Sequence, residues 1–153
     1  SKKALQKLIY LIERKGIVLG YDFSIHYYGP YSSELDDAVH SMYIQGIVKI
    51  IPDGMSQRIH LTEISDMFES KTLSQADENI IESVLEVFGS MTPFDLEVIT
   101  TTDFVARELY KSNKTCTDNI IIEGVKKIKG DKFSNEKIQG AISILRYNGY
   151  NWY

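Results

Sequence analysis

The chain has 153 residues, of which 43% are apolar and 25% are charged, and its formal net charge is −4 at pH 7. These proportions are those of a globular protein with a core and exclude a disordered chain, while the apolar runs are far shorter than the roughly 18 residues of a membrane span. No signal-peptide pattern is visible at the N-terminus, and the single cysteine, Cys116, cannot form an internal disulfide, so we expect a soluble cytoplasmic protein that does not bind membranes.

The first part of the chain predicts a helix, a strand and a second helix. Helical spacing of apolar residues predicts a helix over residues 2–15. Its inward-facing residues are expected to be Leu5, Leu8, Ile9 and Ile12. Alternation predicts a strand over residues 23–28, which Gly29-Pro30 ends. Ser32 or Ser33 is then expected to cap a helix that runs to about Gln45.

A hairpin and a short helix are expected next. Two strand-like runs, 47–51 and 57–61, flank the pair Asp53-Gly54, which is a strong hairpin signal. Thr62 is expected to cap a short helix that carries Ile64, Met67 and Phe68. Helix, strand, helix and two-stranded hairpin is the order of a winged-helix module, with the helix after Ser32 as the candidate reader and the hairpin as the wing.

The second half of the chain predicts four helices, so the fold class is mainly α with a small β-wing. Each helix follows a residue whose side chain can cap it. The expected caps are Ser74, Thr92, Thr117 or Asp118, and Ser134. We expect a winged-helix-like module over residues 1–70 and a helical bundle over 71–153 that packs on it to form a single compact unit, with the joint at 71–74.

Four aromatic residues close the sequence within seven positions. They are Tyr147, Tyr150, Trp152 and Tyr153. Left in solvent they would form a costly apolar patch, so we expect them to dock on the body of the same chain, with a second subunit as the alternative. A homodimer is therefore left open.

Several segments carry a resemblance to a known family. They are Lys3-Ala-Leu-Gln-Lys-Leu-Ile-Tyr-Leu-Ile12, His26-Tyr-Tyr-Gly-Pro-Tyr-Ser32, Gly46-Ile-Val48 and His60-Leu-Thr62. In this order they resemble the YwgA-like proteins of bacteria and archaea and, more distantly, the SocA-like (Panacea) antitoxin domain. The resemblance is dense over residues 2–65 and implies a winged-helix fold and a regulatory or toxin-neutralising role, without assigning a reaction. A helix usually precedes this first segment in the family, and it is absent from the sequence here.

The preferred functional hypothesis is recognition of a protein partner by the strand-to-helix corner. The candidate residues are Tyr28, Gly29, Pro30, Tyr31 and Ser32. Tyrosine is favoured at interfaces because it offers a large amphipathic surface at low entropic cost. The structural alternative is that Tyr27 packs in the core, Gly29-Pro30 makes the turn, and Tyr28 and Tyr31 brace it.

The alternative hypothesis is a DNA-binding transcriptional regulator. The candidate reader helix contains no lysine or arginine but has Glu34, Asp36 and Asp37, which would face phosphates although they also offset the helix dipole. Basic residues elsewhere are the nucleic-acid candidates. They are Lys3, Lys7, Lys49, Arg58, Lys126, Lys127 and Lys129.

Catalysis has no support in the residue pattern. Cys116 has no histidine at a recognisable spacing. His26 and His60 fall on strands that a winged helix would pair, but two imidazoles alone do not make a zinc site. We expect no catalytic residue, no metal and no cofactor.

Overall fold

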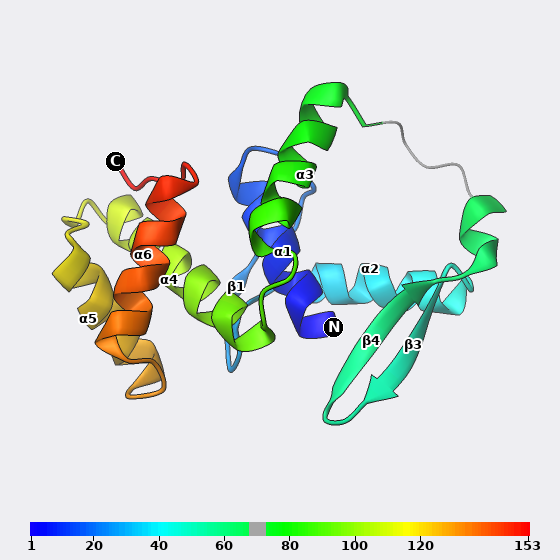
Figure 1. The fold of residues 1–153 in the computed structure, drawn as a ribbon, viewed down its shortest axis with the longest axis horizontal. Coiled ribbons are helices and arrows are strands. Elements are labelled where there is room, and N and C mark those ends of the chain that lie inside the picture. Colours follow the sequence, from blue (N-terminus) through cyan, green and yellow to red (C-terminus); the bar gives the residue numbers. More distant parts are fainter. Residues whose placement is uncertain (68–72) are drawn as a thin grey trace.

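The computed structural model describes residues 1–67 and 73–153, which form a helical body and an arm that projects from it (Figure 1). The body contains α1 (Lys2–Arg14), α3 (Gln75–Phe88), α4 (Pro93–Lys111), α5 (Asp118–Lys129) and α6 (Asn135–Tyr147). The arm contains α2 (Ser33–Ile44), β3 (Val48–Asp53), β4 (Ser56–Leu61) and the 3-10 helix η1 (Glu63–Met67). The mainly helical fold is confirmed. The expected position of Phe68 and the boundary at residue 70 lie outside the described residues.

The helix starts follow the capping signals. The side chains of Ser32, Ser74, Thr92, Thr117 and Ser134 each accept a hydrogen bond from a backbone N–H in the first turn of the following helix. In α4, Pro93 occupies the first turn, where its missing N–H costs nothing. All four helices expected in the second half are therefore confirmed, each beginning after its expected cap.

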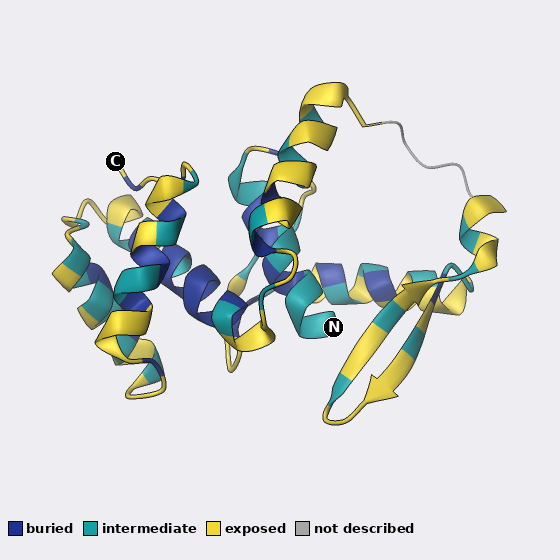
Figure 2. Cartoon of the chain, in the orientation of Figure 1, coloured by how far each residue is buried: buried dark blue, intermediate teal, exposed yellow. Residues whose placement is uncertain are grey.

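Helix α4 is the centre of the body and packs against α1, α5 and α6. The run from Leu96 to Asp103 is buried throughout, including Thr100, Thr101 and Thr102 (Figure 2). Threonine has a modest helix propensity, so packing rather than propensity maintains this segment. Thr100 and Thr102 donate their hydroxyl protons to carbonyl oxygens four residues earlier, whereas the hydroxyl of Thr101 has no partner among the described residues.

Two threonine-to-valine replacements on α4 test this difference. A buried hydroxyl without a partner is a cost that valine, with nearly the same shape, removes. We expect Thr101→Val to preserve the free energy of unfolding or raise it by about 1 kcal/mol, and Thr100→Val to lower it by about 1 kcal/mol. Urea unfolding followed by circular dichroism measures both. Equal losses in the two variants would contradict the assignment.

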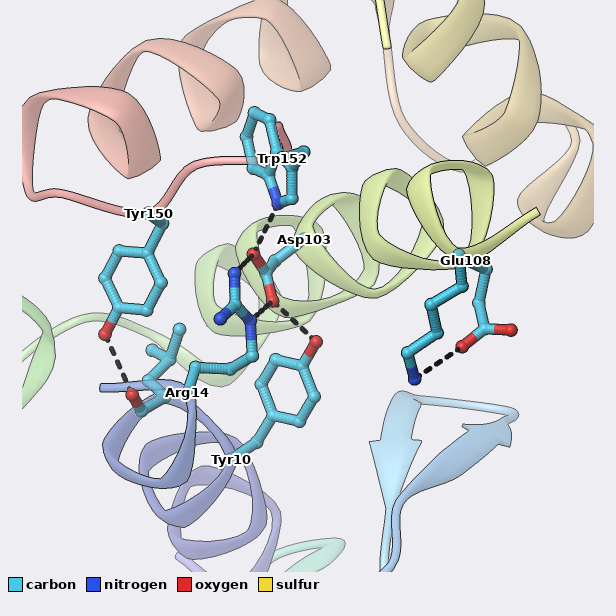
Figure 3. A network of polar contacts seen from close by, with 8 residues as sticks. Tyr10, Arg14, Asp103, Glu108, Tyr150 and Trp152 are labelled. Carbon is cyan, nitrogen blue, oxygen red and sulfur yellow. Dashed lines mark hydrogen bonds and ion pairs between the residues drawn. The ribbon is translucent and has the colours of Figure 1, made fainter. Parts of the chain in front are cut away.

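A buried carboxylate on α4 joins α1 to the C-terminal segment (Figure 3). Asp103 is fully buried and accepts hydrogen bonds from the Tyr10 hydroxyl at 2.6 Å and the Trp152 indole at 2.8 Å. Arg14 binds both carboxylate oxygens, at 2.7 and 3.0 Å. Tyr150 donates to the Leu11 carbonyl oxygen at 2.9 Å. The network therefore ties three segments far apart in sequence to one another.

The docking of the C-terminal aromatic residues is confirmed in part. Tyr150 and Trp152 are buried on the body, as expected. Tyr147 and Tyr153 are exposed instead, because they lie on the solvent side of α6 and at the chain end.

The segment after residue 23 is a hairpin, and the expected single strand over 23–28 is wrong. β1 (Ser24–His26) turns at Tyr27-Tyr28 and pairs antiparallel with β2 (Gly29–Tyr31), so Gly29-Pro30 continues the sheet on the return strand. β3 and β4 form a separate hairpin with the expected turn at Gly54. Within the described residues β1 pairs with β2 alone, so the expectation that His26 and His60 lie on paired strands is also wrong.

Helix α1 is buried on more than its expected stripe. Ile12 is buried as expected, but Leu5, Leu8 and Ile9 are only half-buried. The other buried residues of α1 are Gln6, Lys7, Tyr10 and Leu11. The reason is that α1 lies between α3 and α4 and also contacts β2, so its polar face is enclosed as well. Gln6 and Lys7 on this enclosed face contact the segment at residues 30–32, which is part of the candidate site.

Candidate functional site at the β1–β2 corner

The corner, residues 26–32, lies against α4 at a point where only glycine fits. Gly29 has a φ of +98°, which is a left-handed conformation that L side chains rarely adopt. A Cβ atom at this position would lie 2.9 Å from the Thr101 hydroxyl oxygen and 3.4 Å from Cγ of Glu97. Close approach and backbone conformation thus both require glycine, and together they set the direction of the turn.

Two polar side chains of α1 hold the return strand. Gln6 donates to the Ser32 carbonyl oxygen at 3.0 Å and accepts from the Ser32 N–H at 2.9 Å. Lys7 donates to the Pro30 carbonyl oxygen at 3.2 Å. Ser32 also caps α2, accepting a hydrogen bond from the Leu35 N–H. The corner is therefore fixed to α1 on one side and to the start of α2 on the other.

A buried ion cluster lies beneath the turn. The carboxylate of Glu97 on α4 is 3% exposed and lies 3.2 Å from Nζ of Lys129 and 2.9 Å from Nζ of Lys132. Lys129 also donates to the Tyr27 carbonyl oxygen at 2.6 Å. Burial lowers the pKa of Lys7 from 10.5 to about 8, with the positive charges of Lys129 and other lysines adding to the shift and Glu97 partly opposing it. The cluster anchors the turn to α5, about a hundred positions away in the sequence.

The outer side of the turn presents two tyrosines between two lysines. Tyr27 is 77% exposed and Tyr28 is 43% exposed, and their rings meet edge to face at 4.7 Å between centroids. Nζ of Lys3 lies 3.5 Å from the Tyr28 ring centroid, and Nζ of Lys132 lies 5.1 Å from both ring centroids. These distances are within the range of cation–π interactions, so the exposed rings are held in place.

A pocket of about 380 Å³ opens beside Tyr28, between α1, the turn and the start of α2. Lys3 and Lys7 line one side and Tyr28 and Tyr31 the other. The Tyr31 ring lies 4.6 Å from that of His26, which braces it. The arrangement suits binding through charge and aromatic contact.

The structure separates the predicted protein-binding residues by exposure. Gly29, Pro30 and Ser32 are buried, so they shape the corner from within. Tyr28 is exposed and Tyr31 is half-buried, and both reach the pocket. The expectation that Tyr27 packs in the core is wrong, because the chain reverses at this residue and leaves its side chain in solvent.

Sequence reasoning missed Gln6, Tyr27 and Lys132 as members of this site. The available signals were a glutamine within the family-like first helix, a Tyr-Tyr pair immediately before Gly-Pro, and a lysine three positions after Lys129. None of them indicates a contact with residues 97–132.

The predicted nucleic-acid candidates do not form one surface. Lys7 and Lys129 lie in the interior cluster around Glu97, and Lys3 lies on the Tyr28 ring. Arg58 pairs with Asp53 at 2.7 Å on the wing. The remaining candidates are Lys49 on β3 and Lys126 and Lys127 on α5.

The acidic start of α2 is occupied by local contacts. Asp36 pairs with Lys2 at 3.3 Å, and the Glu34 carboxylate accepts a hydrogen bond from the Ser32 hydroxyl at 3.0 Å. Backbone and serine hydrogen bonds lower the pKa of Glu34. Because its lowered pKa keeps Glu34 ionised, the first turn of the expected reader helix remains negatively charged.

Other chemistry finds little support in the described residues. Within residues 1–67 and 73–153, no three His, Cys, Asp or Glu side chains gather as metal ligands would. Burial raises the pKa of the Cys116 thiol, which disfavours the reactive thiolate. No helix in the same part of the chain combines the length and apolar character needed to cross a membrane.

The comparison with protein families assigns the first two-thirds of the chain. The family model of the antitoxin SocA-like Panacea domain matches residues 5–105. No curated protein matches the chain. The matched range covers about two-thirds of the sequence and includes α1, the corner and Glu97, whereas Lys129 and Lys132 lie beyond it. The SocA-like part of the resemblance found in the first segments is thereby confirmed, and the chain belongs to the SocA-like Panacea antitoxin domain family.

Proposed function

We propose that this protein is an antitoxin-like regulator that acts by binding another protein through the corner, without a catalytic step of its own. The observation that carries the proposal is the exposure of Tyr27 and Tyr28 on a turn that Gln6, Lys7 and Lys129 hold in place. The family match supports the same role, because an antitoxin acts on a toxin.

The rigidity of the turn favours recognition over a merely structural role. An exposed aromatic ring contributes to binding when little conformational entropy is lost on contact. Lys3 and Lys132 already restrict the Tyr27 and Tyr28 rings, so a partner meets a preorganised surface. Tyr10 and Tyr150, whose rings stabilise the fold, are buried, whereas Tyr27 and Tyr28 leave ring surface accessible to a partner.

The charge distribution makes DNA the weaker candidate. In a winged helix the helix after the corner enters the major groove, where anionic side chains are repelled by phosphate. Glu34, Asp36 and Asp37 lie in that position on α2. The α2 helix followed by the β3–β4 hairpin supports a winged-helix-like assignment for the arm, but one that serves protein contacts.

We also propose that the chain folds as one compact unit. α1 belongs to the first seventy residues yet packs against α3 and α4, which supports one compact unit rather than two independent domains. A reducing cytoplasm is the proposed location, since Cys116 is a free thiol.

Affinity capture from the native host tests the proposal. The tagged chain is purified with nuclease treatment, and retained proteins and nucleic acids are quantified, with size-exclusion chromatography to detect a homodimer. We expect one protein to be retained in a defined ratio to the chain after nuclease treatment. Retention of a discrete DNA sequence with no protein partner would overturn the proposal.

A double variant of the turn is expected to lose the captured partner. Tyr27→Ser with Tyr28→Ser removes both exposed rings and is predicted to weaken binding more than about tenfold. The matched control is Tyr110→Ser, which removes a similarly exposed ring from the C-terminal end of α4. This variant is expected to bind the partner as the wild type does. Isothermal titration with the purified partner measures both affinities, and comparable affinities in the two variants would place the interface elsewhere.

A further inference from the structure

The corner concentrates positive charge in an acidic protein. Five lysines surround the turn and its pocket, and two carboxylates accompany them. The lysines are Lys2, Lys3, Lys7, Lys129 and Lys132, and the carboxylates are Asp36 and Glu97. The whole chain has a formal net charge of −4, so this surplus of cations is local to the site. A local surplus of this kind attracts an anionic group.

Two of the five lysines, Lys3 and Lys7, line the pocket and form no ion pair with a carboxylate among the described residues. Lys2 is paired with Asp36, Lys132 with Glu97, and Lys129 with both Glu97 and the Tyr27 carbonyl oxygen. Lys3 contacts the Tyr28 ring, and Lys7 makes a single hydrogen bond to the Pro30 carbonyl oxygen among the described residues. An ammonium group has three donors. Lys3 and Lys7 are also four positions apart on α1, which places them on one face of the helix.

The shape of the pocket favours a side chain on a peptide over a free ion. Its volume of about 380 Å³ exceeds that of a single anion, and its aromatic walls offer apolar contact to neighbouring groups. The lining contains no arginine, which is the residue best suited to bidentate phosphate binding. The exposed rim formed by Tyr27 adds contact area that only a larger partner can use.

We propose that the pocket beside Tyr28 binds a carboxylate side chain of the partner, with Lys3 and Lys7 as its cationic contacts. The segment recognised is an acidic peptide with apolar residues next to the carboxylate, which pack on Tyr27 and Tyr28. This inference rests on the proposed function and specifies the chemistry of the partner segment.

A peptide-binding experiment with the full chain tests the inference. The probe is a fluorescein-labelled decapeptide of alternating Glu and Leu, and the matched probe has Gln in place of Glu. We expect the Glu peptide to bind about tenfold more tightly than the Gln peptide in fluorescence anisotropy. Equal affinities would overturn the inference. Displacement of the Glu peptide by inorganic phosphate at equimolar amounts would also overturn it in favour of a phosphate site.

Lysine variants locate the binding. Lys3→Gln is expected to weaken binding of the Glu peptide severalfold and binding of the Gln peptide much less. Lys7→Met is expected to do the same, and because Lys7 is buried, Lys3→Gln keeps the test valid if Lys7→Met does not fold. The control Lys127→Gln changes an exposed lysine on α5. A loss in the control as large as in Lys3→Gln would show general electrostatic attraction and contradict the site.

The pH dependence of binding provides a second measurement. Lys7 faces Lys3 on its own helix, Glu97 on α4, Lys129 on α5 and Lys132 in the following loop, with His26 and the Lys2–Asp36 pair also at the pocket. With its pKa at about 8, Lys7 is cationic at about pH 7 and neutral at about pH 9.5. Binding of the Glu peptide is therefore expected to weaken over this range, and less so in Lys7→Met. A flat profile in the wild type would contradict the role of Lys7.

The outcomes separate the two proposals. Capture of a protein that depends on the tyrosines, without preference for the Glu peptide, retains the proposed function and removes the carboxylate site. Capture of DNA alone removes both.

Discussion

Replacement of Asp103 by alanine is expected to lower the free energy of unfolding by about 3 to 5 kcal/mol. The carboxylate is fully buried and pairs with Arg14 through both oxygens while accepting hydrogen bonds from Tyr10 and Trp152. Without it, a guanidinium that is largely enclosed has no countercharge, and two buried donors have no acceptor. Urea unfolding followed by circular dichroism measures the loss. Trp152, the only tryptophan, reports in fluorescence whether the C-terminal segment has detached.

An acidic residue on the same helix provides the control for Asp103. Glu108 pairs with Lys111 at 3.5 Å, and both side chains are more than half exposed. Exposed ion pairs of this kind contribute less than about 1 kcal/mol. We therefore expect Glu108→Ala to unfold nearly as the wild type does. A loss in Asp103→Ala no greater than that in Glu108→Ala would mean that the network does not stabilise the fold.

The second large effect is expected for Gly29→Ala, which should lower the free energy of unfolding by about 2 to 5 kcal/mol. A positive φ costs a non-glycine residue roughly 1–2 kcal/mol, and overpacking adds about 1–3 kcal/mol. The added Cβ would lie 2.9 Å from the Thr101 hydroxyl oxygen. Urea unfolding measures the stability, and binding of the captured partner shows whether the turn has moved.

Two further variants separate strain from overpacking at Gly29. Gly54 on the wing has a φ of +62°, and a Cβ atom added there would meet nothing within 4 Å, so Gly54→Ala is expected to show the backbone cost alone. The double variant Gly29→Ala with Thr101→Ala is expected to lose less than the sum of its single changes, because it removes the close contact. Strict additivity in this pair would contradict contact between the corner and α4.

Much of the fold follows from local signals. The caps Ser32, Ser74, Thr92, Thr117 and Ser134 each act on backbone N–H groups three residues away, so sequence spacing is sufficient to place them. The Gly54 turn is likewise encoded next to the strands it joins. These elements were predictable because their determinants lie within a few positions.

The corner was harder to predict because its determinants are distant in sequence. Lys129 reaches the Tyr27 carbonyl oxygen, and Gly29 lies on Thr101 of α4. The alternation of apolar and polar residues over 23–28 carries no information about either contact. Taken alone, it indicated a continuous strand. Hydrophobic periodicity also places Gln6 and Lys7 on the surface. In the structure both are buried, and Gln6 donates to the Ser32 carbonyl oxygen while Lys7 donates to the Pro30 carbonyl oxygen.

Covalent labelling of tyrosines in the purified complex shows whether the corner is the surface that binds the partner. The chain has 10 tyrosines, and exposed ones lie on several faces. Hydroxyl-radical footprinting with mass spectrometry compares the labelling of each in the free protein and in the complex. We expect Tyr27 and Tyr28 to lose labelling on binding, while Tyr110 and Tyr147 keep it. Unchanged labelling of Tyr27 with protection of Tyr43 on α2 would show that the arm, not the corner, meets the partner.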